Sequence, residues 1–448
     1  MGLTEGERRI SAAYPRGLAV DLGGPDPVDS AATADGWGTG RLVRAEVLTR
    51  LLLGMVDARP GYTARLKLVG ARITGRLDLT RATVACGFHL ERCWLDDAIE
   101  VRNARMRMVE LVRCRIPAFW GWGLQVDGPV GFRESRVGAI GLADAAIAGR
   151  LHLTGVRLSN PGARALHGTR LTVAHSVLCH DLTATGEVRL VDAYVGGALL
   201  LTRARFDNPG GTALHLHGIR VDQSIDCDDG FRAVGGVRLS SSRVGGQFLV
   251  DGRIDGTLDL SDAQIQTVAV PAAFAEGIRL DGLTYSGLKP DEPVAARLGW
   301  LRRDRDGHRA QPYEQLAGHY RRLGQDSHAR RVLLAKRRAY RSTLPWWRQV
   351  GGLAMDALAG YGYVPGRALA WLVAAWLAGW AYFATAVRPA PDPGLYALDL
   401  LLPGSPFGME GRYPPHGTAF GVAVGLQAMG WALSLAVLPA VARALSRN

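Results

Sequence analysis

The stretch of sequence that decides the fold is LKLVGARITGRLDLTRATV, residues 66–84. Apolar residues occur there in pairs at a spacing of two, as in Leu66 and Leu68, and each pair is followed by a second pair that begins with a small residue, as in Ala71 and Ile73. Side chains at this spacing share one face of a strand. Successive pairs begin about five or six residues apart, so the chain must turn a corner after each very short strand.

The same unit of about 11 residues recurs along most of the chain, so four sides would close a coil of about 22 residues. Later copies begin at Leu77, Phe88, Ile99, Val109, Val130, Ile140, Leu151, Val188, Leu199, Val237, Leu258 and Ile278. We expect glycine at the corners, where a tight turn needs a free backbone; the candidates are Gly75, Gly87, Gly197, Gly246 and Gly256. Two longer corners, Ser159–Gly162 and Asp207–Gly210, carry nearly the same letters 48 residues apart. They predict a duplication of about two coils.

These pairs resemble the pentapeptide-repeat family, which implies a right-handed quadrilateral β-helix, except that every second side is one residue longer here. A membrane hairpin predicted after the solenoid makes the order of parts similar to a bacterial family of membrane-associated repeat proteins, often labelled membrane-associated oxidoreductases. That label would imply redox activity. Pentapeptide-repeat proteins can also mimic DNA with an acidic surface, but the nearly balanced charge of residues 61–287 argues against such a role.

The chain is predicted to have four parts. Residues 1–60 form an N-terminal helical cap, because the open end of a stack of strands would otherwise pair with other chains. Residues 61–287 form the mostly β solenoid, residues 288–348 a basic helix-turn-helix connector, and residues 349–448 a hairpin of two transmembrane helices. The formal net charge is +12, and most of it lies in the connector.

Two long uncharged runs, about 368–387 and 417–442, predict the transmembrane helices, since about 20 apolar residues cross a bilayer. The basic sequence before the first run places both ends of the hairpin in the cytoplasm by the positive-inside rule. We therefore expect a multi-pass protein of the cell membrane with a cytoplasmic solenoid. Asp399, between the two runs, is expected to be a solvated acid on an interfacial helix, and the alternative is a residue that lines a pore or a re-entrant segment.

Two sets of residues are candidate interaction sites. Basic side chains of the connector are suited to anionic lipid beside a membrane, where nucleic acid is the less favoured ligand. They are Arg321, Arg322, Arg330, Arg331, Lys336, Arg337, Arg338 and Arg341. Small residues at a spacing of four let helices approach closely, within the hairpin or in a homo-oligomer. They are Ala370, Ala374 and Ala378 in the first run and Gly417, Gly421 and Gly425 in the second.

No motif for catalysis or for a cofactor is found. Glycines at 360–366 have the wrong spacing for a dinucleotide site. Cys93 and Cys114 are expected to be buried structural residues one coil apart. His175, Cys179 and His180 are the nearest approach to a metal cluster, but their side chains should not converge. No cofactor or metal is therefore expected.

We therefore expect a non-enzymatic, membrane-anchored scaffold whose solenoid binds a cytoplasmic protein partner. An oligomeric two-span channel or sensor is the first alternative, and an oxidoreductase, by family label only, is the second.

Overall fold

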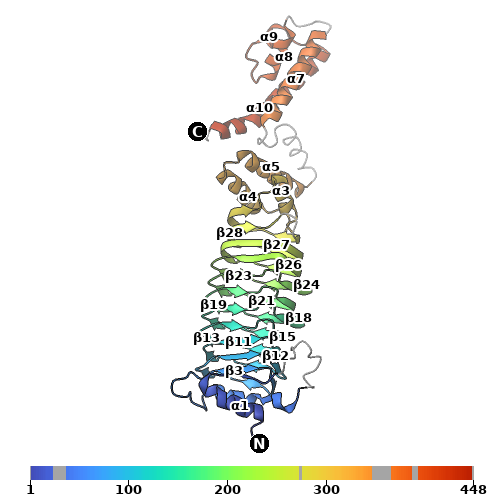
Figure 1. Ribbon diagram of the computed structural model, residues 1–448. Helices are drawn as coiled ribbons and strands as arrows, with labels where there is room; N and C mark the ends of the chain where they lie inside the picture. The colour runs from blue at the N-terminus through green and yellow to red at the C-terminus, as the bar shows by residue number, and fades with distance from the viewer. Residues whose placement is uncertain (1, 24–36, 272–274, 346–364, 386–391, 446–448) are drawn as a thin grey trace. The chain divides into compact units, whose positions relative to one another are not determined.

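The computed structural model describes residues 2–23, 37–271, 275–345, 365–385 and 392–445. The chain forms two compact units, residues 1–315 and 316–448. The first unit is a solenoid of about ten coils in which every strand pairs in parallel with strands of the neighbouring coils (Figure 1). The predicted repeat solenoid is thus confirmed.

Four columns of short strands form the walls of the solenoid, in chain order around each coil. The first wall contains β3 (Leu66–Val69), β7 (Phe88–Glu91), β11 (Val109–Val112), β14 (Val130–Gly131), β17 (Leu151–His152), β20 (Val177–Leu178) and β23 (Leu199–Leu200). The second begins with β4 (Arg72–Thr74) and β8 (Trp94–Leu95), and the third with β5 (Leu77–Asp78) and β9 (Ile99–Glu100). The fourth contains β6 (Thr83–Val84), β10 (Arg105–Met106), β13 (Gln125–Val126), β16 (Ala146–Ile147), β19 (Thr172–Val173), β22 (Tyr194–Val195) and β25 (Arg220–Val221).

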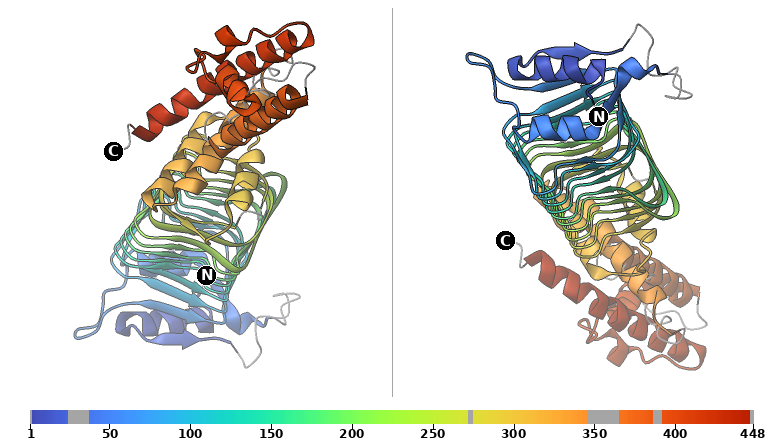
Figure 2. Two further views of the ribbon diagram at one scale, coloured as in Figure 1. Left: turned by 90° about the horizontal axis from the view of Figure 1, so that it is seen from above. Right: turned by 90° about the horizontal axis from the view of Figure 1, so that it is seen from below.

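Longer strands bend around corners and contribute to more than one wall. They are β12 (Arg115–Trp120), β15 (Arg136–Gly141), β18 (Arg157–His167), β21 (Thr183–Arg189), β24 (Arg205–His215), β26 (Ile225–Arg238), β27 (Arg243–Asp259), β28 (Gln264–Ala269), β29 (Ala275–Arg279) and β30 (Thr284–Lys289). Viewed from either end, successive coils follow one another as parallel outlines, each shifted from the last (Figure 2). One outward position therefore recurs on one wall, coil after coil.

The strand register sets the coil length. Leu66 pairs with Phe88, 22 residues later, as the sequence predicts. Leu151 pairs with Val177, so this coil has 26 residues, because the longer corner Ser159–Gly162 bulges from it. Asn160 Nδ2 closes that corner by donating to the carbonyl oxygen of Arg164 at 2.9 Å. In the second long corner, two coils on, Asn208 makes the same contact with the carbonyl oxygen of Thr212 at 2.8 Å.

The corners differ from the prediction that glycine supplies their backbone freedom. In two stacked columns of corners, most residues with a left-handed backbone are not glycine. The first column includes Arg81, Asn103, Asp144, Arg170, Asp192, Ser241 and Asp262. The second includes Arg92, Arg113, Glu134, Asp181, Arg203 and Asp229. Of the predicted glycines, Gly75 has a left-handed φ of +80°. Gly246 and Gly256 are required instead by close stacking, because a Cβ there would lie 2.7 Å and 2.6 Å from the carbonyl oxygens of Gln223 and Gly235.

Inward side chains fill the solenoid with apolar ladders. Cys93 and Cys114 occupy neighbouring coils, and both are buried, as predicted. Their thiols donate to backbone carbonyl oxygens, including that of Leu68 for Cys93 and that of Leu90 for Cys114. Burial raises the pKa of the Cys114 thiol well above its ordinary value, which keeps the thiol protonated and unreactive.

The N-terminal cap is not purely helical. It contains α1 (Glu5–Ala13), the 3₁₀ turns η1 (Tyr14–Arg16) and η4 (Thr39–Arg41), α2 (Ala45–Leu52) and two strands, β1 (Ala19–Asp21) and β2 (Leu42–Arg44). β1 pairs with β3 and β2 with β4, so the cap occupies the hydrogen-bonding edge of the first coil. Helices alone would leave that edge unpaired.

The other edge of the solenoid is covered by α3 (Val294–Arg302) and the first turns of α4 (Ala310–Arg322). Arg297 of α3 is buried and donates to the carbonyl oxygens of Val270 and Pro290 at 2.7 Å and 2.6 Å. Gln311 of α4 donates to the carbonyl oxygen of Leu283 at 2.9 Å. These side chains satisfy groups that a further coil would otherwise pair.

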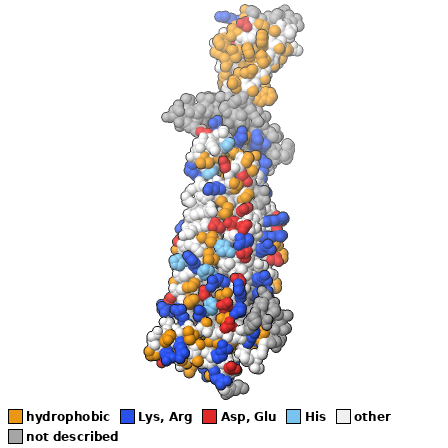
Figure 3. All heavy atoms as spheres, in the orientation of Figure 1, with side chains coloured by type: hydrophobic (Ala, Val, Ile, Leu, Met, Phe, Trp, Pro, Cys, Tyr) orange, Lys and Arg blue, Asp and Glu red, His pale blue; other side chains and the backbone are white. Residues whose placement is uncertain are grey.

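The second unit contains the end of α4, α5 (Asp326–Ser342), α7 (Pro365–Thr385), α8 (Pro393–Leu401), α9 (Met409–Arg412) and α10 (Thr418–Leu445). Phe383 of α7 and Leu426 of α10 pack on Tyr396 and Leu400 of α8 in a small apolar core. Other apolar side chains of these helices gather on the surface (Figure 3).

The prediction of two transmembrane helices is wrong. Among the residues that the structure describes, no helix is long and apolar enough to cross a membrane. α7 ends at Thr385, and apolar side chains of both predicted spans pack on α8, the segment predicted to be an outer loop. The predicted multi-pass location in the cell membrane, with the orientation derived from it, is wrong for the same reason.

Asp399 is not the solvated acid that was expected. Its side chain is 0% exposed. Its two carboxylate oxygens accept from the backbone N–H groups of Phe407 and Met409 at 2.8 Å and 2.7 Å. Asp399 therefore ties α8 to the loop that leads into α9.

Candidate functional site: an arginine-lined groove

One outward position on the second wall is arginine on most coils. Strand register places Arg72, Trp94, Arg115, Arg136 and Arg157 above one another on five successive coils. The column then continues through Thr183, Arg205, Arg232 and Arg253. Neighbouring strands are about 4.8 Å apart, and like charges directly opposite one another are destabilising. An arginine column of this kind is therefore a candidate binding surface for anionic groups. We call it the arginine ladder.

The first half of the arginine ladder borders a groove of about 670 Å³. Its lining residues are Arg72, Trp94, Leu95, Asp96, Arg115, Ile116, Pro117, Arg136, Val137, Gly138, Arg157 and Ser159. The hollow arises beside the arginines, where Gly138 stacks on Pro117. A Cβ at Gly138 would lie 2.2 Å from the carbonyl oxygen of Pro117, so no side chain fits there.

The two ends of the arginine ladder carry their own acids. At the N-terminal end, Arg72 Nε lies 3.0 Å from Asp96 Oδ1. At the C-terminal end, Arg232 Nη2 lies 2.9 Å from Asp255 Oδ2, and Arg253 also pairs with Asp255. Hydrogen bonds from Arg253 and Arg232 lower the pKa of the Asp255 carboxyl, so it stays ionised.

Arg115, Arg136 and Arg157 form the middle of the arginine ladder, and all three are exposed. The guanidinium of Arg115 lies over the Trp94 ring. Among the described residues that line the groove, Asp96 is the only acid. Three exposed arginines thus follow one another on three consecutive coils of this wall.

The arginine ladder could have been found in the sequence from a repeated three-residue pattern. A count of charges over whole segments does not reveal it. A small or apolar residue, arginine and an inward apolar residue recur on most coils, as in Ala71–Ile73, Cys114–Ile116 and Ser135–Val137. Counting charges over residues 61–287 hides this pattern, because acids elsewhere in the solenoid balance the arginines.

The predicted basic residues lie on the two helices that the connector was expected to form. Gly324, with φ +72°, ends α4, and Ala329, Val332 and Leu333 bury one side of α5. The basic side chains, Arg321, Arg322, Arg330, Arg331, Lys336, Arg337, Arg338 and Arg341, are exposed or half-buried. Their assignment to anionic lipid relied on adjacent membrane spans, which the described helices do not provide.

The predicted small-residue faces do not hold the second unit together. Ala370, Ala374 and Ala378 of α7 and Gly417, Gly421 and Gly425 are all exposed. The tightest approaches are at two other glycines. A Cβ at Gly379 would lie 2.9 Å from Leu426 Cδ1, and one at Gly430 would lie 2.0 Å from the carbonyl oxygen of Leu401. A role for the small faces in a homo-oligomer stays a prediction.

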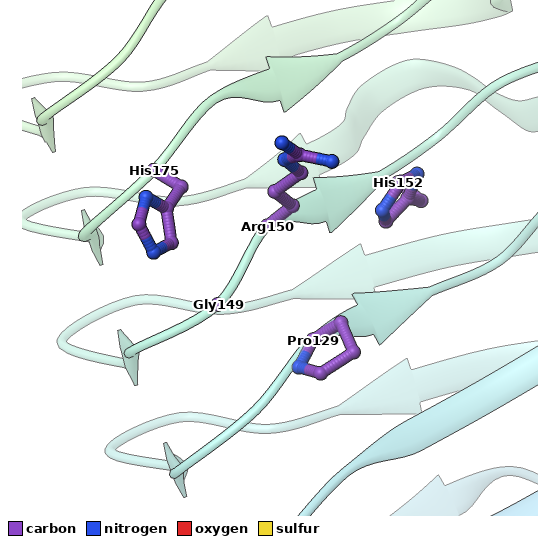
Figure 4. Close-up of a pocket in the computed structure, with 5 residues that line it drawn as sticks. All are labelled: Pro129, Gly149, Arg150, His152 and His175. Atoms are coloured by element: carbon purple, nitrogen blue, oxygen red, sulfur yellow. The ribbon is translucent and has the colours of Figure 1, made fainter.

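His175, Cys179 and His180 do not form a metal site. Cys179 is buried, and burial raises the pKa of its thiol to about 12. His175 instead lines a separate pocket with Arg150 and His152 (Figure 4). The described part of the chain contains no group of three or more His, Cys, Asp or Glu side chains that could hold a metal ion.

Comparisons with known proteins give no match, so the function is inferred from the geometry of the site. No family model, no curated protein and no solved structure matches the chain, so nothing among them supports the oxidoreductase label.

Proposed function

We propose that this protein is a non-enzymatic binding scaffold whose solenoid holds an acidic segment of a protein partner along the arginine-lined groove. The observation that carries the proposal is the in-register stack of Arg115, Arg136 and Arg157 beside a hollow of about 670 Å³. Carboxylates of a partner would bind the guanidinium groups, often bidentately, and would relieve the repulsion between them.

The groove suits a polypeptide better than a nucleic acid. Bases bind single-strand grooves by stacking on aromatic rings, but the guanidinium of Arg115 already covers Trp94 at 4.3 Å. Pro117 and Gly138 leave a neutral hollow beside the charges, where the side chains of an extended peptide can lie.

We also propose that the coil is the right-handed quadrilateral of the pentapeptide-repeat proteins that the sequence resembles. Such a fold supports a scaffold function only in that it displays side chains on flat walls. No described residue supplies the membrane spans that a channel needs. The scaffold is therefore the only function that we put forward.

The test is binding of a fluorescent peptide of about twelve residues that alternates Glu and Thr, measured by anisotropy with the full-length protein. We expect the variant R115Q/R136Q/R157Q to weaken binding by at least about tenfold, because it removes three charge-assisted contacts. The matched control is R105Q/R220Q/R243Q, which removes the same charge from exposed positions of the fourth wall.

Two results would overturn the proposal. One is equal loss of affinity in both triple variants, which would show attraction by net charge alone. The other is tighter binding of a single-stranded oligonucleotide than of the peptide, lost in the ladder variant, which would assign the groove to nucleic acid.

A further inference from the structure

A second pocket lies at the corner between the fourth and first walls, and it is independent of the proposed scaffold function. Its volume is about 290 Å³, and its lining residues are Pro129, Gly149, Arg150, His152 and His175. Pro129, Arg150 and His175 come from three successive coils, and His152 follows Arg150 by two residues (Figure 4). Stacking of the coils therefore brings three nitrogen-rich side chains to one pocket.

Glycines create the hollow. Gly149 stacks directly on the coil below, where a Cβ would lie 2.5 Å from the carbonyl carbon of Gly128. Gly131 lies opposite His152 in the register of the first wall. A Cβ at Gly131 would lie 3.6 Å from His152 Cβ, so the position below the imidazole has no side chain beyond the backbone.

The ionisable side chains that line this pocket all belong to basic residues. Arg150 and the two histidines are the only ionisable side chains among the described residues that line it. Burial, Arg133 and Arg150 lower the pKa of His152, and Glu110 opposes them. Glu110 is itself engaged, since it lies 3.0 Å from His89 Nδ1 and 3.2 Å from Arg133 Nη2. Glu110, the one acid that raises the pKa of His152, therefore already contacts His89 and Arg133.

We infer that this pocket binds the phosphate group of a small molecule. A guanidinium supplies a planar pair of N–H donors for two phosphate oxygens, and each imidazole supplies a further N–H donor. A bound dianion would stabilise the protonated form of His152, which burial and the two arginines disfavour. The volume exceeds that of one phosphate group and leaves room for part of the molecule that carries it.

The experiment is a titration of the full-length protein, labelled at histidine, with inorganic phosphate at constant ionic strength. NMR follows the imidazole signals, and the variants H152Q and H175Q assign them. We expect saturable shifts of both signals with Kd of about 1 mM or below. His217, whose Nδ1 contacts Ser240 Oγ at 2.9 Å on another wall, is the internal control that should not move.

The variant R150Q should weaken phosphate binding by about tenfold or more, because it removes the bidentate donor. R136Q, which alters the arginine ladder instead, should leave phosphate affinity within about twofold. The inference is overturned if the shifts do not saturate, if chloride produces the same shifts, or if R150Q binds phosphate as the unaltered protein does. Because the acidic-peptide assay uses another wall, either proposal can fail without the other.

Discussion

The guanidinium carbon of Arg115 lies 4.3 Å from the centre of the Trp94 ring, and strand register places the two residues directly opposite each other on neighbouring coils. The stacked ring holds one arginine of the ladder against the wall. Arginine can stack in this way and still present its outer N–H groups to a carboxylate.

We therefore predict that R115K weakens binding of the acidic peptide by about threefold to tenfold, although the charge is kept, because a lysine ammonium lacks the planar fork. Anisotropy titration measures the change. R220K, on the fourth wall, is the control and should leave affinity unaltered. Unchanged affinity in R115K would mean that only the charge of this position matters.

A buried carboxylate fixes the N-terminal cap. Glu7 is 0% exposed and accepts from the backbone N–H groups of Thr4 and Arg44 at 2.9 Å and 3.0 Å and from Arg44 Nη2 at 2.6 Å. E7Q should lower the free energy of unfolding by about 1–3 kcal/mol, because charge-assisted hydrogen bonds are lost. Urea unfolding followed by circular dichroism checks this. E46Q, which alters an exposed pair on α2, should change stability little.

The same carboxylate predicts a pH dependence. The hydrogen bond from Arg44 lowers the pKa of Glu7 from 4.5 to about 2. Since the folded-state pKa lies below the unfolded one, this stabilisation is present above about pH 4.5 and is lost as pH falls toward 2. The melting temperature should therefore fall more between about pH 5 and pH 3 in the unaltered protein than in E7Q. Parallel curves for the two proteins would contradict this assignment.

Two glycines of α10 should respond oppositely to alanine. G430A places a methyl group 2.0 Å from the carbonyl oxygen of Leu401 and should destabilise the second unit by about 2–3 kcal/mol. A methyl group at Gly421 would have no neighbour within 4 Å, so G421A should stabilise α10 by about 0.5–1 kcal/mol through helix propensity. Hydrogen exchange of α10 amides measures both. Destabilisation by G421A would show that the small face packs against another copy.

The left-handed corners supply a further matched pair. Ser241 has φ +56° and is exposed at its corner. S241V should cost about 1–2 kcal/mol, since a β-branched side chain clashes in this conformation, whereas S241G should cost little or nothing. Urea unfolding of the full-length protein compares them. Equal stability of the two variants would mean that the corner relaxes to another backbone conformation.

The sequence by itself determined the solenoid, its coil of about 22 residues, the buried cysteines and the helix-turn-helix of the connector. Each depends on periodicity within a short window, such as the pairs that begin at Leu66 and Ala71. Local alternation dictates which side chains point inward, because burying them is the dominant favourable contribution to folding.

Only the tertiary structure decided the rest. The arginine ladder joins residues such as Arg136 and Arg157 that are one coil apart, and the corner of Ser159–Gly162 lengthens the next coil of the ladder, from Arg157 to Thr183. The helices α7 and α10 illustrate the same point, since an apolar run does not say whether its side chains face lipid or pack on α8. Asp399 is buried because a distant loop supplies two backbone donors. In each case the physical cause is a partner brought close by stacking or packing, which no local pattern encodes.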